Sequence, residues 1–527
     1  MSAGGGGLRR HVGTVAAGTM ASRVLGLVRD MLMSRILGQN LVTSAFLVAF
    51  SVPNLARRLF GEGALTSAFV PVFKDLAENG RMDAARRLAR AVATMAWLML
   101  GAAVALAILG VRGTLALWPS IPPRAGLALR LLPVMLPYAL FICAAAFGMA
   151  VLNALGRFAA AALVPCVLNV VWIGALLSLL LLPGLEPFDR VRLLAWAILA
   201  AGALQMACML WCARRRGVPL APTREGWRDE ATRLVWRNTA TAIVGAGAIQ
   251  INALLDQVLA MCAAEWAPTA ISNADRLMEL PLSLFGTAFG TVLLPAFAGR
   301  FAKGDLAGAR DALRSGVRDM MLLMVPAAAG LALLSGDLVR VVYQGGAFTA
   351  VDTVRVARAL SVYAAGLAFF GLSKALTPWF HAQNDMRTPL RVAVRMVFAN
   401  FTLNLLSVLL LSPEWRHVGI AGATVACSAA SCAWLLALAR RRNGPLGLGA
   451  LRAPLLRVAL AALAMAAALL AAARPLAAAL PDGSAAARVL RLGLEVALGA
   501  GVYFASLGAL LPEARGALLR RLLRRRG

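Results

Sequence analysis

Several charged residues stand inside stretches that are otherwise apolar enough to cross a membrane. Residues 22–38, SRVLGLVRDMLMSRILG, carry Arg23, Arg29, Asp30 and Arg35. A charge at the centre of a membrane helix costs about 2.5 to 3.5 kcal/mol, whereas a central Leu or Ile offsets only about 0.3 to 0.6 kcal/mol. We therefore expect these side chains to face protein or a water-filled cavity. Because guanidinium groups bind phosphates through paired hydrogen bonds, the predicted chemistry is binding of a polyanion such as a pyrophosphate.

The helical period assigns the charges of this segment to faces of one helix. At about 100° per residue, Arg23 and Asp30 lie on one face and Arg29 lies on an adjoining flank. One alternative is that Arg29 and Asp30 form a purely structural ion pair. For Arg35 we favour an interfacial position near the helix end, where a long side chain can reach polar surroundings. For Arg23 and Arg29 we favour ligand binding.

A second segment, SVPNLARRLFGEGA at 51–64, combines a proline with two arginines. Pro53 lacks a backbone donor and can bend or unwind a helix. Arg57 and Arg58 follow one turn later. We expect one of them to reach the interior and the other to reach the cytoplasmic interface.

A third segment, ISNADRLMELPLSLFGTAFG at 271–290, holds three charges within one helical turn. Asp275 and Glu279 are four residues apart, and Arg276 is three residues before Glu279, so an ion-paired cluster is feasible. For Glu279, a structural ion pair is a reasonable interpretation. Arg276 is the better candidate for contact with a ligand.

Two further segments carry uncharged polar groups and one acid. GAIQINALLDQVLA contains Asn252, Asp256 and Gln257, and FANFTLNLLS contains Asn400, Thr402 and Asn404. A buried carboxylate with amide carbonyls and a hydroxyl suits Na⁺ or a proton. The same groups also suit hydrogen bonding between helices, and the two readings stay equally open.

The composition predicts membrane helices as the elements that position these residues. The chain has 527 residues, of which 60% are hydrophobic, and a mean hydropathy of +0.76. A soluble protein of this length is less apolar and more charged. With about 20 apolar residues needed for each span, the sequence predicts an all-α polytopic membrane protein with about fourteen helices. We place them near 11–37, 41–72, 86–111, 127–152, 158–182, 191–213, 232–262, 268–299, 316–343, 355–381, 389–411, 417–439, 454–473 and 487–511.

The distribution of basic residues tests this assignment. The net charge of +29 is typical of nucleic-acid binding, but most arginine clusters, such as 214–216 and 440–442, fall in short gaps between apolar runs. Placing the N-terminus in the cytoplasm makes these loops cytoplasmic. The opposite loops are nearly free of Lys and Arg, and four of them, 38–44, 263–270, 344–352 and 475–486, contain none. The pattern follows the positive-inside rule and predicts both termini in the cytoplasm.

The chain also contains an internal repeat. SAFVPVFKDLAENGRMDAAR at 67–86 resembles TVLLPAFAGRFAKGDLAGAR at 291–310, an offset of 224 residues, and NALGRF at 153–158 echoes QNDMRT at 383–388. Both copies of each segment fall on the cytoplasmic side, so the predicted halves are parallel repeats, as in some secondary transporters. We divide the chain into an N-lobe of six helices (1–216), a C-lobe of six helices (217–442), and two additional helices with a basic cytoplasmic tail (443–527).

The sequence gives little support for metal binding, for disulfide bonds or for enzymatic catalysis. Cys208 and Cys212 are one helical turn apart and could meet a metal, but we favour packing, and no disulfide framework is implied. The chain has three histidines, with no metal-spacing pair, and it lacks an acid cluster of the glycosyltransferase type and a nucleophile elbow. We therefore expect a transporter rather than an enzyme.

Three stretches resemble one known family. TMASRVLGLVRDMLMSRILG, TSAFLVAFSVPNLARRLFGEGALTSAFVPVF and NADRLMELPLSLFGTAFGTVLLPAF are similar to the MurJ/MviN lipid II flippases, which belong to the multidrug/oligosaccharidyl-lipid/polysaccharide exporter superfamily. The resemblance covers essentially the whole chain. It implies movement of the undecaprenyl-pyrophosphate-linked peptidoglycan precursor, lipid II, from the inner to the outer leaflet of the cytoplasmic membrane. Two six-helix lobes would alternate the access of a central cavity, and the additional helices would form a groove for the lipid tail.

The resemblance also implies roles for particular residues. The substrate-binding set is Arg23, Arg29, Asp30, Arg57 and Arg276. Gating or ion-pair contacts are expected from Ser22, Asn54, Asp275 and Glu279. A sodium site, as found in some members, would comprise Asp256, Asn400, Asn404, the Ile420 carbonyl and Thr424.

This sequence departs from the family pattern at two points. One acid expected in the eleventh helix is an amide here. The motif TDAF, common at the start of the second helix, reads TSAF, with Ser44 in place of an acid proposed to matter for gating. Either that role is dispensable, or another group such as Asp352 fills it.

The implied partners are lipid II and membrane lipids, without nucleic acid. We expect no cofactor, coupling to Na⁺ or H⁺ driven by the membrane potential, and a monomer that works near the cell-wall synthesis machinery. One alternative is an exporter of another undecaprenyl-linked glycan, such as O-antigen or capsule units. Another is a drug/cation antiporter of the same superfamily, but that function favours acids in the first-lobe cavity, where this chain has arginines.

Overall fold

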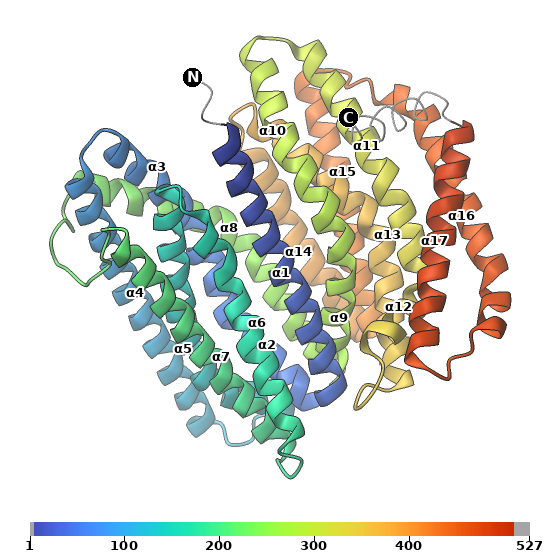
Figure 1. The fold of residues 1–527 in the computed structure, drawn as a ribbon, viewed down its shortest axis with the longest axis horizontal. Helices are drawn as coiled ribbons and strands as arrows, with labels where there is room; N and C mark the ends of the chain where they lie inside the picture. The colour runs from blue at the N-terminus through green and yellow to red at the C-terminus, as the bar shows by residue number, and fades with distance from the viewer. Residues whose placement is uncertain (1–4, 511–527) are drawn as a thin grey trace. The chain divides into compact units, whose positions relative to one another are not determined.

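The protein is helical throughout the described part of the chain (Figure 1). The computed structural model describes residues 5–510, apart from the side chains of 5–16, 61–62, 244–246, 248–249, 285, 287–288 and 291. Within these limits it contains no strand, only an isolated bridge between Gly345 and Phe348. The predicted all-α class is confirmed.

The helices group into two compact units. The first comprises the residues up to Thr269 together with Gly345–Phe348, and the second comprises the residues from Ala270 onward apart from that short segment. The lobes predicted at 1–216, 217–442 and 443–527 concern the repeated topology and stay a prediction. The first unit contains α1 (Gly5–Leu37), α2 (Leu41–Ala56), η1 (Arg57–Ala64), α3 (Leu65–Glu78), α4 (Met82–Leu117), α5 (Pro123–Ala154), α6 (Phe158–Leu180), α7 (Pro187–Arg215) and α8 (Glu230–Ala263).

The second unit holds most of α9 and all later helices. They are α9 (Ala267–Pro281), η2 (Leu282–Gly286), α10 (Thr287–Ala302), α11 (Leu306–Leu333), α12 (Ser335–Tyr343), α13 (Ala350–His381), α14 (Arg387–Leu410), α15 (Arg416–Asn443), η3 (Leu448–Leu451), α16 (Arg452–Ala479) and α17 (Ala485–Leu510).

Every predicted span corresponds to helix. Ten helices of the described residues are long and apolar enough to cross a membrane: α4 to α7, α11 and α13 to α17. The other four predicted spans correspond to α1, to α2 with α3, to α8 and to α9 with α10. These four are the segments that carry the intramembrane charges and Asp256.

A π-helical stretch interrupts the second and the eighth predicted span. The span predicted at 41–72 divides into α2, the π-helical η1 and α3, and the span predicted at 268–299 divides into α9, the π-helical η2 and α10. Pro53 lies one turn before η1, and Pro281 ends α9 directly before η2. Because proline lacks the N–H of a regular turn, it favours such a change of hydrogen-bond register. A Cβ at Gly63 would lie 2.7 Å from the Arg58 carbonyl oxygen, so glycine permits the turn at η1.

Several helix boundaries fall at the offset of the predicted repeat. The offset of 224 residues carries the end of α3 at Glu78 onto the end of α10 at Ala302, and the start of α4 at Met82 onto the start of α11 at Leu306. It also carries η1 onto 281–288, the stretch that contains η2. Arg86 and Arg310, which the same offset relates, each lie close to a glycine of a later loop. A Cβ on Gly217 would lie 3.4 Å from Arg86 Nη2, and a Cβ on Gly444 would lie 3.2 Å from Arg310 Nη2.

One predicted boundary is wrong. The span predicted at 316–343 is two helices, because α11 ends at Leu333 and a separate short helix, α12, begins at Ser335. The sequence there reads Ser335, Gly336 and Asp337, and these residue types favour the start of a helix. Ser335 Oγ lies 2.9 Å from Ser361 Oγ of α13, which ties the start of α12 to the neighbouring helix.

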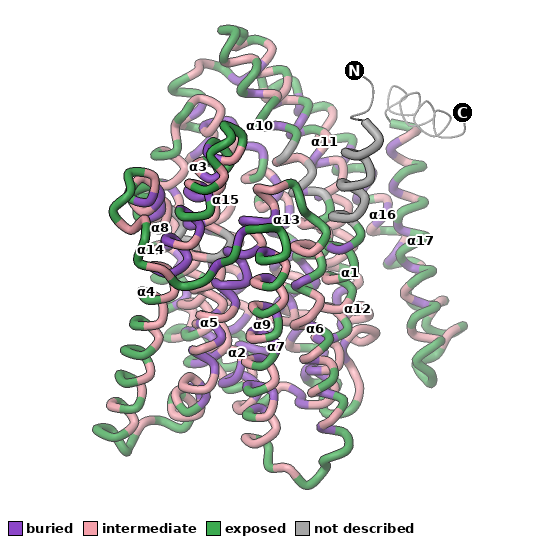
Figure 2. Tube along the Cα trace, turned by 60° about the vertical axis from the view of Figure 1, so that its left-hand side comes forward, coloured by how far each residue is buried: buried purple, intermediate pink, exposed green. Residues whose placement is uncertain are grey.

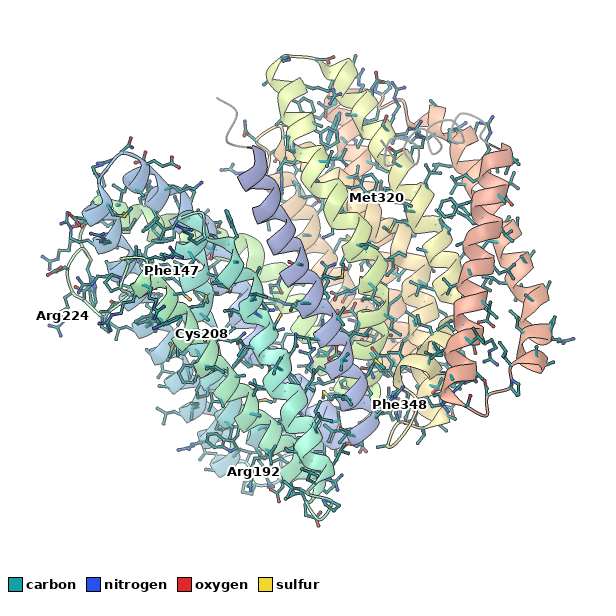
Figure 3. All side chains as sticks on the ribbon, viewed as in Figure 1. Phe147, Arg192, Cys208, Arg224, Met320 and Phe348 are labelled. Carbon is teal, nitrogen blue, oxygen red and sulfur yellow. The ribbon has the colours of Figure 1, made fainter. Side chains whose placement is uncertain are left out.

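Each unit has its own apolar core, and its outer helices expose apolar side chains. In the first unit, Phe69, Phe73 and Phe147 are buried together between α3, α4 and α5 (Figure 3). In the second unit, Tyr503 of α17 is buried and donates to the Leu322 carbonyl oxygen of α11 at 2.8 Å. By contrast, α4 and α17 show long exposed stretches (Figure 2), with Leu106 68% exposed. Exposed leucines along a whole helix are typical of a surface that faces lipid.

Candidate functional site

Arg29 of α1 lies inside the first unit and is held on three sides. Its side chain is 11% exposed. Nε and Nη2 both donate to Asp30 Oδ1, at 2.9 and 2.6 Å, and Nη1 donates to Asn169 Oδ1 at 2.9 Å. The guanidinium carbon lies 4.6 Å from the ring centroid of Trp172. The predicted inward position of Arg29 is confirmed, and the structural pairing with Asp30 is present as well.

The geometry leaves part of this guanidinium available. An arginine carries five N–H donors in a fixed fork, and three of those of Arg29 go to Asp30 and Asn169. One N–H therefore remains on each terminal nitrogen. Two adjacent N–H groups are the donors that bind a phosphate through paired hydrogen bonds. These two N–H groups of Arg29 make no hydrogen bond in the described chain.

Asn169 and Trp172, both on α6, are the residues of this site that sequence reasoning missed. Asn169 is buried, and its Nδ2 donates to the Ser22 carbonyl oxygen at 3.1 Å, which links α6 to α1. Trp172 is buried and makes edge-to-face contacts with Phe46 and Phe50 of α2. The available signal was a single asparagine in the apolar run VPCVLNVVW, because an isolated polar group within a span usually has a specific partner.

The other predicted residues of the first unit are less buried. Arg23 is exposed and makes no hydrogen bond or ion pair within the described residues. Arg57, at the start of η1, is half-buried, and its Nε donates to Asn54 Oδ1 at 2.9 Å. Arg58 is exposed, with Nη1 3.4 Å from Gln250 Oε1 of α8. Ser22 contributes its backbone carbonyl, rather than its hydroxyl, to the contact with Asn169.

The charges of α9 form a more open cluster in the second unit. Arg276 Nη1 lies 3.7 Å from Glu279 Oε2, and both side chains are almost half exposed. Asp275, next to Arg276, is half-buried and also has partners. The predicted pairing of Arg276 with Glu279 is confirmed. Exposed pairs of this kind contribute little to stability, so Arg276 can leave Glu279 for a stronger ligand at small cost.

Four of the five predicted sodium ligands lie together between α14 and α15. Asn404 Nδ2 donates to Asn400 Oδ1 at 2.8 Å, and Asn400 Nδ2 lies 3.4 Å from Thr424 Oγ1. Thr424 Oγ1 donates to the Ile420 carbonyl oxygen at 3.2 Å. Amide, hydroxyl and carbonyl oxygens are hard ligands that fit an alkali cation. One of these contacts, between Asn400 and Thr424, also joins the two helices, so a structural role fits these residues as well as cation binding does.

The remaining candidate ligand, Asp256, belongs to the first unit. It lies on α8 and is half-buried, and its Oδ2 accepts a hydrogen bond from Asn252 Nδ2 at 3.2 Å. No group of three or more His, Cys, Asp or Glu side chains that could hold a metal occurs in the searched part of the chain. Cys208 and Cys212 pack against the apolar core of the first unit, which supports their predicted packing role.

Ser44, where many family members have an acid, is fully buried. Its Oγ lies 3.2 Å from Thr269 Oγ1, and the Thr269 hydroxyl donates to the Trp266 carbonyl oxygen at 2.7 Å. Asp352 serves its own helix: it completes a capping box with Thr349 and accepts from Arg355 Nη1 at 3.2 Å. The groups near Ser44 are thus uncharged, and Asp352 is engaged in starting α13.

Ten helices long and apolar enough to cross a membrane, with an arginine buried among the helices of the first unit, are typical of a multi-pass membrane protein. The chain belongs to the lipid II flippase MurJ family, whose model matches residues 33–481. That range contains Arg57 and Arg276, and it begins after Arg29.

Relatives and solved structures agree with this family. The chain is 36% identical over 416 residues to a probable lipid II flippase MurJ of Rhizobium tropici, covering 77% of this chain and 76% of the relative. It is 32% identical over 453 residues to the lipid II flippase MurJ of Burkholderia cenocepacia, covering 83% and 84%. Its fold is similar to that of a lipid II flippase MurJ in an inward closed conformation, with a TM-score of 0.75 and 21% identity over 95% of this chain and 99% of the other. An inward-facing multidrug MATE transporter matches with a TM-score of 0.64 and 13% identity, over 81% and 95%.

Proposed function

We propose that this protein flips lipid II from the inner to the outer leaflet of the cytoplasmic membrane. The observation that carries the proposal is the buried Arg29, which is fixed by Asp30, Asn169 and Trp172 and keeps one N–H on each terminal nitrogen. A pyrophosphate linked to a lipid is an anion of the right kind for this group. Membership of the family supports lipid II as the particular substrate.

In the proposed mechanism, arginines bind the pyrophosphate of the substrate and release it again. Arg29 binds the pyrophosphate while the lipid tail stays in the bilayer, with Arg23 and Arg57 as further cations of the first unit. Arg276 of the second unit is a further proposed contact for the substrate, and its exposed pair with Glu279 opens at small cost. The lobes alternate the access of the cavity, and no bond of the substrate is made or broken. The protein therefore acts as a transporter and not as an enzyme.

Further proposals concern topology and coupling. Both termini lie in the cytoplasm, in keeping with the basic loops of the sequence. The two additional helices hold the lipid tail, and the protein works as a monomer near the cell-wall synthesis machinery. Movement of Na⁺ or H⁺ resets the transporter, because the membrane potential supplies about 2.3 kcal/mol per charge for each 100 mV. The buried amides of α14 and α15 are the proposed sodium contacts.

The proposal is tested by complementation in a bacterium depleted of its own lipid II flippase. The Arg29→Ala and Arg276→Ala variants should insert into the membrane at normal levels and fail to restore growth. Arg29→Lys should also fail, because an ammonium group cannot bind Asp30, Asn169 and a phosphate in one plane. Arg81→Ala, at a side chain that is 60% exposed in a loop, is the matched control and should restore growth fully.

Two outcomes would contradict the proposal. Normal growth with Arg29→Ala would remove Arg29 from the mechanism. Restoration of growth without any rise in the lipid II that can be reached from outside would point to another undecaprenyl-linked substrate.

A further inference from the structure

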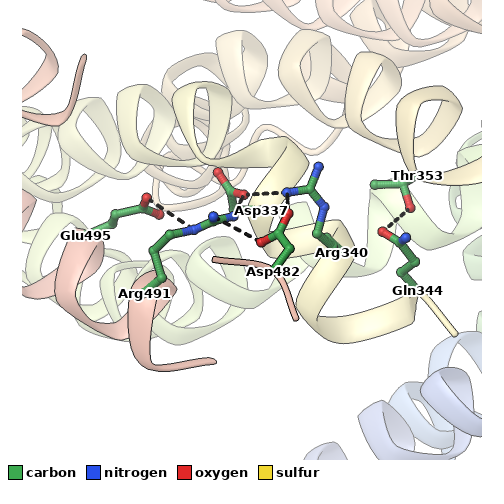
Figure 4. A network of polar contacts seen from close by, with 7 residues as sticks. All are labelled: Asp337, Arg340, Gln344, Thr353, Asp482, Arg491 and Glu495. Atoms are coloured by element: carbon green, nitrogen blue, oxygen red, sulfur yellow. Dashed lines mark hydrogen bonds and ion pairs between the residues drawn. The ribbon is translucent and has the colours of Figure 1, made fainter. Parts of the chain in front are cut away.

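Five charged residues join the last two helices to the rest of the second unit (Figure 4). We call them the hairpin network. They lie on α12, in the turn between α16 and α17, and on α17 itself. The members are Asp337, Arg340, Asp482, Arg491 and Glu495.

Arg491 of α17 is the centre of the network. Its side chain is only 7% exposed. Nη2 donates to Asp337 Oδ1 of α12 at 2.7 Å, and Nη1 lies 3.0 Å from Asp482 Oδ1 in the turn. Arg340 bridges the same two acids, with Nη1 3.3 Å from Asp337 Oδ1 and 2.9 Å from Asp482 Oδ2. Two arginines and two aspartates therefore form a closed and electrically neutral group.

Glu495 is the third acid and has no cation of its own. Its side chain is 4% exposed, and its nearest cation is Arg491 Nε, which lies 3.9 Å from Oε1. That distance exceeds a hydrogen bond. Oε2 is buried and has no hydrogen-bond partner in the described chain. An ionised carboxylate in this position would be both buried and poorly compensated, which is costly, whereas a protonated carboxyl is far cheaper to bury.

We propose that Glu495 is a proton-binding site, and that it holds its proton while Arg491 is bound to Asp337 and Asp482. The proton exchanges with water through the open side of the network, where Asp482 is 47% and Asp337 29% exposed. Loss of the proton gives a Glu495 carboxylate and a hydrated proton, with no other bond changed. This site is independent of the proposed arginine site for the substrate.

The surroundings supply no other partner for a Glu495 carboxylate. On α17, Arg488 forms no ion pair in the described chain. On α16, residues 458–473 contain no charged side chain, and Arg474 near the end of that helix is exposed. On α11, residues 320–333 contain none either. The titratable and charged groups that face Glu495 are therefore those of the network.

Proton loss has a predictable mechanical effect. A Glu495 carboxylate would compete with Asp337 and Asp482 for the guanidinium of Arg491, because all three would then be anions around one cation. The bond between Arg491 and Asp337 is one of the polar contacts that hold α17 against α12. Deprotonation should therefore loosen the last two helices from α12, and protonation should hold them in place.

The test uses infrared difference spectra of the full-length protein in lipid nanodiscs. The spectrum of wild type minus Glu495→Gln should show the C=O stretch of a protonated carboxyl near neutral pH, and this band should vanish at alkaline pH. In the Asp337→Asn background, Arg491 gains a free N–H for Glu495. The spectrum of Asp337→Asn minus that of the double variant Asp337→Asn/Glu495→Gln should then show carboxylate bands and no band of a protonated carboxyl. Glu265→Gln, at a side chain that is 51% exposed, is the matched control and should give carboxylate bands only.

Two spectroscopic results would contradict the proposed proton on Glu495. A wild-type spectrum with only carboxylate bands near neutral pH would overturn the proposal, as would a protonated band that persists in the Asp337→Asn background. If the Glu495→Gln variant does not fold, the proposal is tested by the midpoint of thermal unfolding of the wild type, measured as a function of pH. Its midpoint should fall as the pH rises, and it should fall less in Asp337→Asn. Because neither measurement records transport, failure here leaves the proposed function untouched.

Discussion

Asn169 on α6 accepts a hydrogen bond from Arg29 on α1 at 2.9 Å, across 140 residues of sequence. The same amide donates to the Ser22 carbonyl oxygen, so one side chain joins two helices and orients a buried cation. The site is thus defined by a contact between helices as much as by the charges of α1.

The first prediction concerns Asn169. Asn169→Ala removes a hydrogen bond to a charged group, which contributes about 1.5 to 3 kcal/mol. Because Arg29 then loses its orientation, lipid II flipping should fall by about tenfold or more. The measurement is the rate of appearance of lipid II on the outer face of proteoliposomes. Ser178→Ala on the same helix is the control, since the Ser178 hydroxyl donates to the Ala175 carbonyl oxygen of its own helix. Equal rates for both variants would show that Asn169 does not orient the site.

The second prediction concerns the buried ion pair of α1. Asp30→Asn leaves Arg29 without its counter-charge, and breaking a buried pair in this way costs about 3 to 5 kcal/mol. The midpoint of thermal unfolding in nanodiscs should fall clearly. A double variant, Arg29→Gln with Asp30→Asn, should be more stable than Asp30→Asn alone, because it carries no unpaired charge. The idea would fail if the double variant were the less stable of the two.

The third prediction concerns Ser44. Ser44→Asp restores the residue type common in the family, but here it places a carboxylate at a fully buried position next to the Thr269 hydroxyl. We expect loss of stability and of growth rescue. Ser44→Ala loses one neutral hydrogen bond of about 0.5 to 1.5 kcal/mol and should remain active. Full activity of Ser44→Asp would show that the region around Thr269 accepts a charge.

The fourth prediction concerns the amides of α14 and α15. If Asn400, Asn404 and Thr424 bind Na⁺, replacement of K⁺ by Na⁺ should raise the unfolding midpoint of the wild type, because a ligand that binds the folded state stabilises it. Asn400→Ala should abolish this shift. Thr402→Ala, at an exposed residue of the same helix, should retain it. The same midpoint in both salts would leave these residues as helix-joining groups only.

The fifth prediction concerns acid stability. Burial alone would raise the pKa of Asp385, but hydrogen bonds from Thr388 and the charge of Arg442 outweigh it, and the pKa lies below its usual value. A carboxyl with a lowered folded pKa stabilises the protein above its unfolded pKa of about 3.9, and this stabilisation disappears as the pH falls through the folded pKa. Asp385→Asn should therefore destabilise the protein at neutral pH and have a shrinking effect in acid. Asp83→Asn, at an 83% exposed side chain, should have little effect at any pH.

Much of this molecule could be predicted from the sequence. Hydrophobic runs located helices along the whole described chain, and ten of these helices are long and apolar enough to cross a membrane. The cost of burying charge correctly turned Arg29 inward. The residues that orient it could not be found in this way, because Asn169 and Trp172 belong to an apolar helix far away in the sequence, and only packing brings them to Arg29.

Other features depend on three-dimensional context in the same manner. Asp337 was placed inside a continuous span, and its position at the start of a separate α12 follows from a helix break that apolar periodicity does not reveal. Arg491 and Glu495 lie within the last predicted span, and nothing in the sequence nearby indicates their partners. Their importance comes from a turn of the chain that returns Asp482 to α12.

The matching positions of the two π-helical stretches bear on the evolution of the protein. Because η1 and the region of η2 share one register in the two repeats, the simplest history is that the altered turn existed before the gene was duplicated. Each repeat then carries its own proline-linked break at the same place in its chain, and the two breaks flank different residues: Arg57 in the first and Arg276 before the second.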